Sequence, residues 1–81
     1  MDENRNIDTL VQRILADVYY AKKNGYGDQF DFQYPNALFN IRDARVGDIV
    51  RKFDSATSND SKWSYHISRD TMLMLTMTSK R

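Results

Sequence analysis

The run from Thr71 to Thr78, TMLMLTMT, restricts the fold of this chain more than any other segment. It is apolar on both faces if it is extended, which is typical of a strand inside a sheet rather than at its edge. A chain of 81 residues has little interior in which to bury such a strand. We therefore expect this strand to be central, to pair with another molecule, or both.

Two other segments alternate with a period of two, but each has one polar face. Residues 29–34 (QFDFQY) and residues 63–68 (WSYHIS) place large apolar side chains at every second position. Pro35 ends the first segment, because proline has no N–H for a strand ladder. Residues 68–70 (SRD) are short enough for a hairpin turn into the C-terminal strand. The simplest antiparallel sheet has the C-terminal strand in the middle, in the order 1-3-2.

The aromatic residues of these two strands admit two interpretations. Strict alternation with polar residues indicates rings that face a core beneath a helix. The alternative is an exposed set of rings that stacks on nucleic-acid bases. The rings concerned are Phe30, Phe32, Tyr34, Trp63 and Tyr65.

Apolar residues from Ile7 to Val18 recur at three- and four-residue spacing, which predicts an amphipathic helix. The pair Asn24-Gly25 supplies its C-terminal stop. The middle of the chain is ambiguous. Asn36 can cap a helix that runs through Ala44, but residues 38–42 also fit a strand.

Gly47 leaves two possibilities for the next segment. Two short helices can meet at the turn Arg45-Val46-Gly47, the second running from about Asp48 to Ala56. Alternatively, one helix runs from about Asp43 to Ala56, and Gly47 costs it about 1 kcal/mol relative to alanine.

The composition favours binding over catalysis. The chain has no cysteine, which excludes disulfides, thiolate nucleophiles and zinc–cysteine sites. No phosphate-binding glycine motif is present, and we expect no cofactor, no metal and no enzymatic activity. His66 is the single histidine, and a small nuclease that uses it with Arg69, Tyr65 or a carboxylate is a remaining alternative. The N-terminus is polar and no apolar run is long enough for a membrane span, so we expect one cytoplasmic domain, residues 1–81.

The predicted α+β order, α-β-α-α-β-β, resembles the winged-helix variant of the helix-turn-helix. Four features carry the resemblance. They are the helix around Leu10–Val18, the strand of Phe30 and Phe32, the Gly47 break and the hairpin from Trp63 to Met77. It implies a small regulatory or accessory protein, dimeric, whose helix after Gly47 enters the major groove of double-stranded DNA. The residues expected to bind nucleic acid are Arg45, Arg51, Lys52, Ser55, Lys62 and Arg69.

The charge distribution agrees with that interpretation in part. Residues 1–35 contain four basic and six acidic residues, whereas residues 36–81 contain eight basic and five acidic. The C-terminal part is therefore the better candidate for a polyanion. However, acidic residues interleave with the basic ones and form charge pairs at helical spacing.

A second function class fits the sequence equally well. The protein is then a protein-interaction module, such as a small inhibitor or adaptor of phage or mobile-element type. It would use exposed aromatic residues, among them Tyr20 and Tyr26, or the methionine-rich C-terminal strand.

Overall fold

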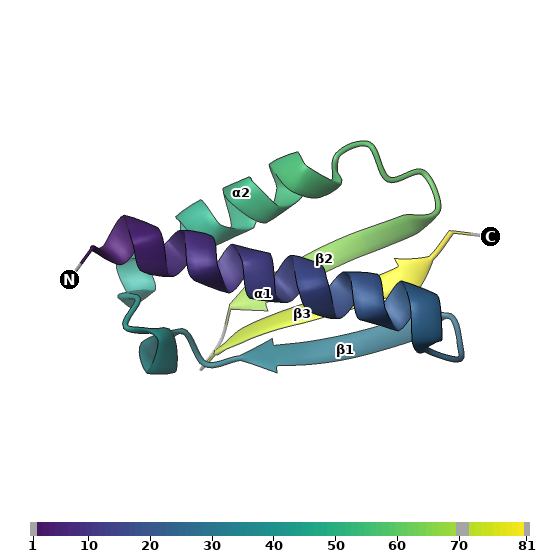
Figure 1. The fold of residues 1–81 in the computed structure, drawn as a ribbon, viewed down its shortest axis with the longest axis horizontal. Coiled ribbons are helices and arrows are strands. Elements are labelled where there is room, and N and C mark those ends of the chain that lie inside the picture. Colours follow the sequence, from purple (N-terminus) through teal and green to yellow (C-terminus); the bar gives the residue numbers. More distant parts are fainter. Residues whose placement is uncertain (1, 70–71, 81) are drawn as a thin grey trace.

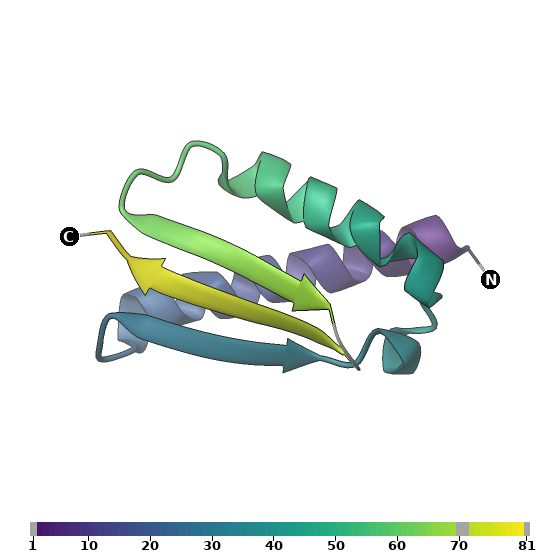
Figure 2. The same ribbon diagram turned by 180° about the vertical axis from the view of Figure 1, so that it is seen from behind.

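The computed structural model describes residues 2–69 and 72–80, which form two layers (Figure 1). One layer is a three-stranded antiparallel sheet with the order β1-β3-β2, and the other contains helices α1 and α2. The predicted α+β class and strand order are confirmed. Seen from behind, the other face of the sheet has no element over it among the described residues (Figure 2).

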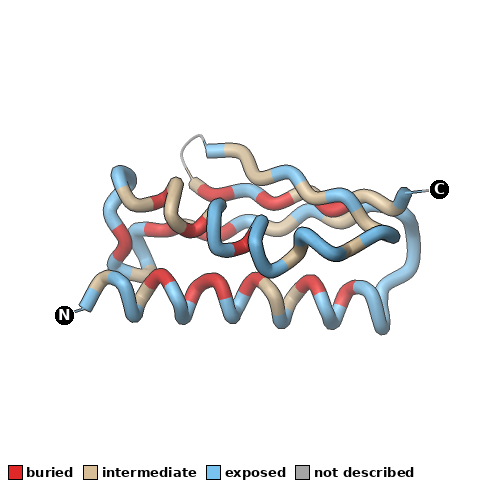
Figure 3. The backbone as a smooth tube through the Cα atoms, turned by 90° about the horizontal axis from the view of Figure 1, so that it is seen from above, coloured by how far each residue is buried: buried red, intermediate tan, exposed pale blue. Residues whose placement is uncertain are grey.

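Helix α1 spans Glu3–Asn24 and ends at Gly25, as predicted. The carboxylate of Asp2 caps its start by accepting a hydrogen bond of 3.0 Å from the backbone N–H of Asn4. The buried positions of α1 lie along the side that faces the sheet and α2 (Figure 3). They are Ile7, Leu10, Val11, Ile14, Val18 and Ala21.

The sheet consists of β1 (Gln29–Tyr34), β2 (Trp63–Arg69) and β3 (Leu73–Ser79). The prediction that β3 is central is confirmed, since it pairs with β1 on one side and β2 on the other. The expectation that both faces of this strand are shielded from water was only half right. Leu73, Leu75 and Met77 are buried against the helices, but the other face of β3 presents Met74, 40% exposed, with two threonines.

The aromatic residues of the two edge strands face the helical layer. Tyr34 is buried, and Phe30, Phe32, Trp63 and Tyr65 are partly buried against the core. The ring of Tyr65 meets that of Phe53 edge to face, with centroids 5.4 Å apart. This confirms the core interpretation of these rings rather than a stacking surface for bases.

The middle of the chain differs from the prediction. An α-helix from Asn36 to Ala44 is wrong, and so is a strand over residues 38–42. Instead two 3₁₀ turns, η1 (Asn36–Phe39) and η2 (Asp43–Arg45), precede α2 (Val46–Thr57). The buried Asn36 side chain explains this, because its amide donates to the Ile41 carbonyl and to the Asp43 carboxylate, both at 2.9 Å.

Helix α2 passes through Gly47 without a break, so the second of the two possibilities is the closer one. Asp48 lies in its first turn, and the preceding η2 extends the helical path back to Asp43. Of the predicted turn over residues 68–70, Ser68 and Arg69 belong to β2. Asp70 lies outside the described residues.

Candidate functional site

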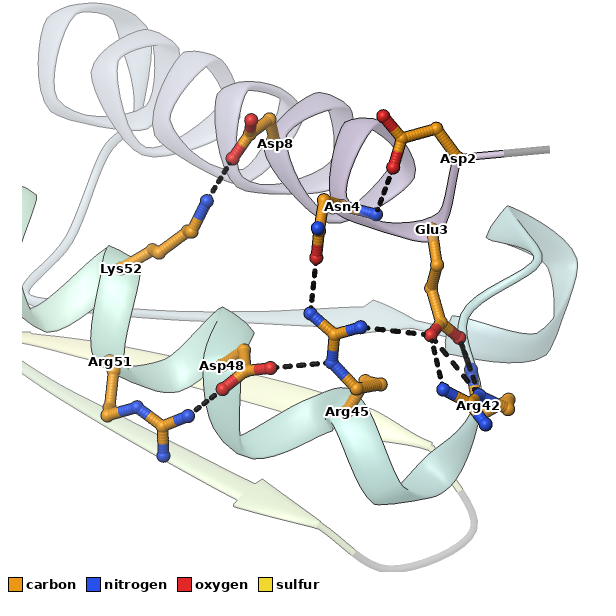
Figure 4. A network of polar contacts seen from close by, with 9 residues as sticks. All are labelled: Asp2, Glu3, Asn4, Asp8, Arg42, Arg45, Asp48, Arg51 and Lys52. Atoms are coloured by element: carbon orange, nitrogen blue, oxygen red, sulfur yellow. Dashed lines mark hydrogen bonds and ion pairs between the residues drawn. The ribbon is translucent and has the colours of Figure 1, made fainter.

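The basic residues predicted to bind DNA are largely engaged with carboxylates (Figure 4). Arg45 is partly buried, and its Nε donates to Asp48 at 2.6 Å while Nη1 donates to Glu3 at 3.1 Å. Arg51 pairs with the other oxygen of Asp48. Two of the predicted DNA contacts therefore share one carboxylate in the first turn of α2.

The side chain of Lys52 reaches toward α1. Its ammonium group pairs with the carboxylate of Asp8, which lies on α1 (Figure 4). Together with the pair between Glu3 of α1 and Arg45 of η2, this contact joins α1 to α2 and to the turn that precedes it. The positive charge of Lys52 is accordingly balanced within the protein.

The remaining predicted residues, Ser55, Lys62 and Arg69, lie at three separate places. A Cβ atom on Gly47 would lie 3.6 Å from Nη1 of Arg51 and 3.9 Å from Nη1 of Arg69, so these two guanidinium groups flank the same point of α2. Ser55 is exposed further along α2. Lys62 precedes β2, whereas Arg69 ends it, which separates them by roughly 23 Å in an extended strand. The six residues do not form one basic face.

A different feature lies between α1 and β1, on the opposite edge of the sheet from α2. It is a depression of about 310 Å³ beside the C-terminal half of α1. Its walls come from the helix, from the glycine that ends it and from the rings of β1. The lining residues are Asp17, Tyr20, Ala21, Asn24, Gly25, Phe30 and Phe32.

A second depression, of about 210 Å³, continues the first along β1. The two share Asp17 and Phe32, and we call them together the β1 groove. The second depression is lined by Arg13, Asp17, Phe32, Gln33, Tyr34, Pro35 and Phe39.

The one carboxylate within the β1 groove is held by two partners. The hydroxyl of Tyr34 donates to Asp17 at 2.7 Å, and Arg13 Nε lies 3.4 Å from the same oxygen. Burial, and then the bond to Asp17, raise the pKa of the Tyr34 hydroxyl well above its usual range, so it remains a donor. The groove therefore has mainly apolar walls, and the polar groups at its centre, Asp17, Tyr34 and Arg13, are paired with one another.

Comparison of the chain with protein-family models, with curated protein sequences and with solved structures finds no match.

Within residues 2–69 and 72–80, no three or more His, Asp or Glu side chains gather so that they could hold a metal ion. No helix in the same ranges is both long and apolar enough to cross a membrane.

His66 lies on the uncovered face of the sheet and is exposed. Its strand neighbour is Thr76, whose hydroxyl donates to Asp31 on the far side at 2.8 Å. Tyr65 points to the opposite face, and Arg69 lies near α2. Neither Tyr65 nor Arg69 therefore lies beside His66 on the uncovered face.

The tyrosines proposed for a protein partner are exposed as predicted. Tyr20 is 69% exposed on the rim of the β1 groove, and Tyr26 is 98% exposed in the loop before β1. Nothing in the sequence indicates that Asp17 and Phe39 line a groove. Their spacing has no recognisable pattern, because the groove depends on how α1 lies over β1.

Proposed function

We propose that this protein is a protein-interaction module that receives its partner in the β1 groove. The observation that supports this most is the pair of adjoining, mainly apolar depressions along one edge of a small sheet. Apolar surface that stays concave and open next to exposed aromatic rings is typical of sites for a protein segment. The exposed ring of Tyr20 on its rim provides an amphipathic contact of the kind enriched in interfaces.

The test is affinity capture from the native host with the full chain as bait. We expect one stoichiometric protein partner with the wild type, and loss of that partner with Tyr20→Glu. The matched control is Tyr26→Glu, because Tyr26 is also exposed but does not line the groove. Equal capture by all three baits, or no partner with the wild type, would contradict the proposal.

Binding of double-stranded DNA is a second candidate, supported by the two guanidinium groups of Arg51 and Arg69 beside Gly47. In a winged-helix arrangement α2 would lie in the major groove, and both arginines would contact phosphate or guanine. The dimer expected with this function stays a prediction.

The DNA candidate is tested by the salt dependence of binding to a mixed-sequence duplex. Replacing Arg51 and Arg69 by alanine should reduce the slope of log K against log salt by about 2, because each phosphate contact contributes roughly one. Lys52→Ala is the control and should change the slope little, since Lys52 has the carboxylate of Asp8 as its partner, whereas Arg51 shares the carboxylate of Asp48 with Arg45. Wild-type protein that shows no salt-sensitive binding would exclude this candidate.

A further inference from the structure

The outer edge of β1 presents backbone groups away from the sheet. The N–H of Ser79 donates to the Asp28 carbonyl at 2.8 Å, which sets the phase of the β1–β3 ladder. Hydrogen-bonded pairs alternate in an antiparallel ladder, so Phe30, Phe32 and Tyr34 bond to β3. The N–H and C=O groups of the residues between them, Gln29, Asp31 and Gln33, point outward.

This edge has few of the features that usually prevent a further strand from pairing. Between Gln29 and Tyr34 there is no lysine, arginine or proline. The register with β3 is continuous over all six residues, without a bulge. The edge is therefore unbroken and can exchange backbone hydrogen bonds with another extended segment.

The β1 groove lies along this same edge and has the period of a strand. Its two depressions lie on either side of Phe32, one beside Phe30 and the other beside Tyr34. Alternate side chains of a strand project to one face about 6.8 Å apart. A strand added to β1 would thus place two successive core-facing side chains in the two depressions.

The charge along the edge of β1 indicates which side chains an added strand would carry. On the uncovered face β1 presents Gln29, Asp31 and Gln33, of which Asp31 alone is charged. Opposite charges on directly paired strand residues stabilise a pair, and like charges destabilise it. A second copy of β1 would bring only glutamine or another Asp31 to this position, whereas a lysine or arginine would complement it.

We propose that the partner is an extended peptide segment that adds to β1 as a fourth strand. Its apolar side chains occupy the β1 groove, and its alternate side chains are basic and face Asp31. This inference rests on the proposed protein-binding function and specifies the partner's chemistry. It also predicts which backbone amides become protected.

The probe is a capped nine-residue peptide in which lysine alternates with leucine or valine, added to the full chain. Amide hydrogen exchange followed by NMR should slow at least tenfold at Gln29, Asp31 and Gln33. The outward amides of the other edge strand, those of Tyr65 and Ile67, should not change. Asp31→Lys should weaken binding of the lysine peptide by about tenfold and make the corresponding glutamate peptide the better ligand.

Several results would overturn the inference. They are absence of binding by the lysine peptide, binding without protection of the three β1 amides, and equal binding of the lysine and glutamate peptides to the wild type. Protection of the same amides by the protein alone at high concentration would assign the edge to a second copy. A host partner that requires Tyr20 but leaves these amides unprotected would keep the proposed function and remove strand addition.

Discussion

At the scale of single residues, the end of α1 depends on the absence of a side chain at Gly25. A Cβ atom there would lie 2.6 Å from the Ala21 carbonyl and 2.6 Å from the ring of Phe30. The carbonyl belongs to the helix backbone and cannot move aside easily. We expect Gly25→Ala to destabilise the protein by about 1–3 kcal/mol, measured by urea unfolding, because overpacking displaces the ring from the β1 groove.

Gly47 is the matched control for that experiment. The nearest atoms to a Cβ at Gly47 are the ends of two arginine side chains, at 3.6 and 3.9 Å, which is ordinary contact. Gly47 lies in the first turn of α2, where alanine reduces the entropy of the unfolded chain. Gly47→Ala should therefore stabilise the protein by up to about 1 kcal/mol. Destabilisation by both substitutions would show that the close contact at Gly25 is not the cause.

Asp60 is a second residue with an identifiable role. Its carboxylate accepts from Lys22, from the Tyr65 hydroxyl and from the backbone N–H groups of Lys62 and Trp63, the last two at 2.9 and 3.0 Å. Burial raises the pKa of Asp60, but these hydrogen bonds outweigh burial and hold the pKa well below its usual range. The carboxylate thus joins α1 to the start of β2.

We expect Asp60→Ala to lower the free energy of unfolding by on the order of 2 kcal/mol at neutral pH, because several donors lose a charged acceptor. Asp54→Ala, at an exposed position of α2, should stay within about 0.5 kcal/mol of the wild type. Thermal unfolding by circular dichroism measures both. Similar losses in the two variants would argue against a specific role for Asp60.

At the scale of elements, the start of α1 is joined to the segment before α2 through Glu3. Its carboxylate accepts from the Arg42 backbone N–H and from Arg42 Nη2, each at 2.9 Å, and from Arg45. The hydrogen bonds from Arg42 lower the pKa of Glu3 from its usual 4.5 to about 2. Since the folded state has the lower pKa, this stabilisation is present above pH 4.5 and is lost as the pH falls toward 2.

Glu3→Gln should remove this pH dependence while keeping the shape of the side chain. We expect the wild type to be the more stable protein above pH 4.5, and the difference to disappear as the pH approaches 2. Urea midpoints measured across this range test it. A constant difference between the two proteins would show that titration of Glu3 is not linked to folding.

The elements also show where sequence reasoning succeeded. The bounds of β1 and the C-terminal end of α1 followed from alternation, from Pro35 and from Asn24-Gly25, which act locally. The 3₁₀ turns did not follow, because the buried amide of Asn36 determines them through bonds to residues five and seven positions away. Likewise, the pairing of Lys52 with Asp8 depends on how α2 packs on α1, which no local spacing specifies.

At the scale of the whole molecule, both layers share one core. Phe53 of α2 is fully buried and its ring contacts that of Tyr65 of β2. The ring centroid of Trp63, the single tryptophan, lies 5.9 Å from that of Phe30 across the sheet. We expect one cooperative transition, in which Trp63 fluorescence and helical circular dichroism change together. Phe53→Ala should lower the free energy of unfolding by about 3–5 kcal/mol and move both signals equally. Separate midpoints would show that the layers unfold independently.

The position of β3 has a consequence for synthesis of the chain. Both edge strands hydrogen-bond to β3, yet β3 follows both of them in the chain and leaves the ribosome after them. Until residues 73–79 have been made, β1 and β2 have no strand to join them and both expose unpaired backbone. No two strands of the sheet can therefore pair before β3 has been made. β3 can then pair locally with β2, but its pairing with β1 joins distant parts of the chain, and contacts of that kind slow folding.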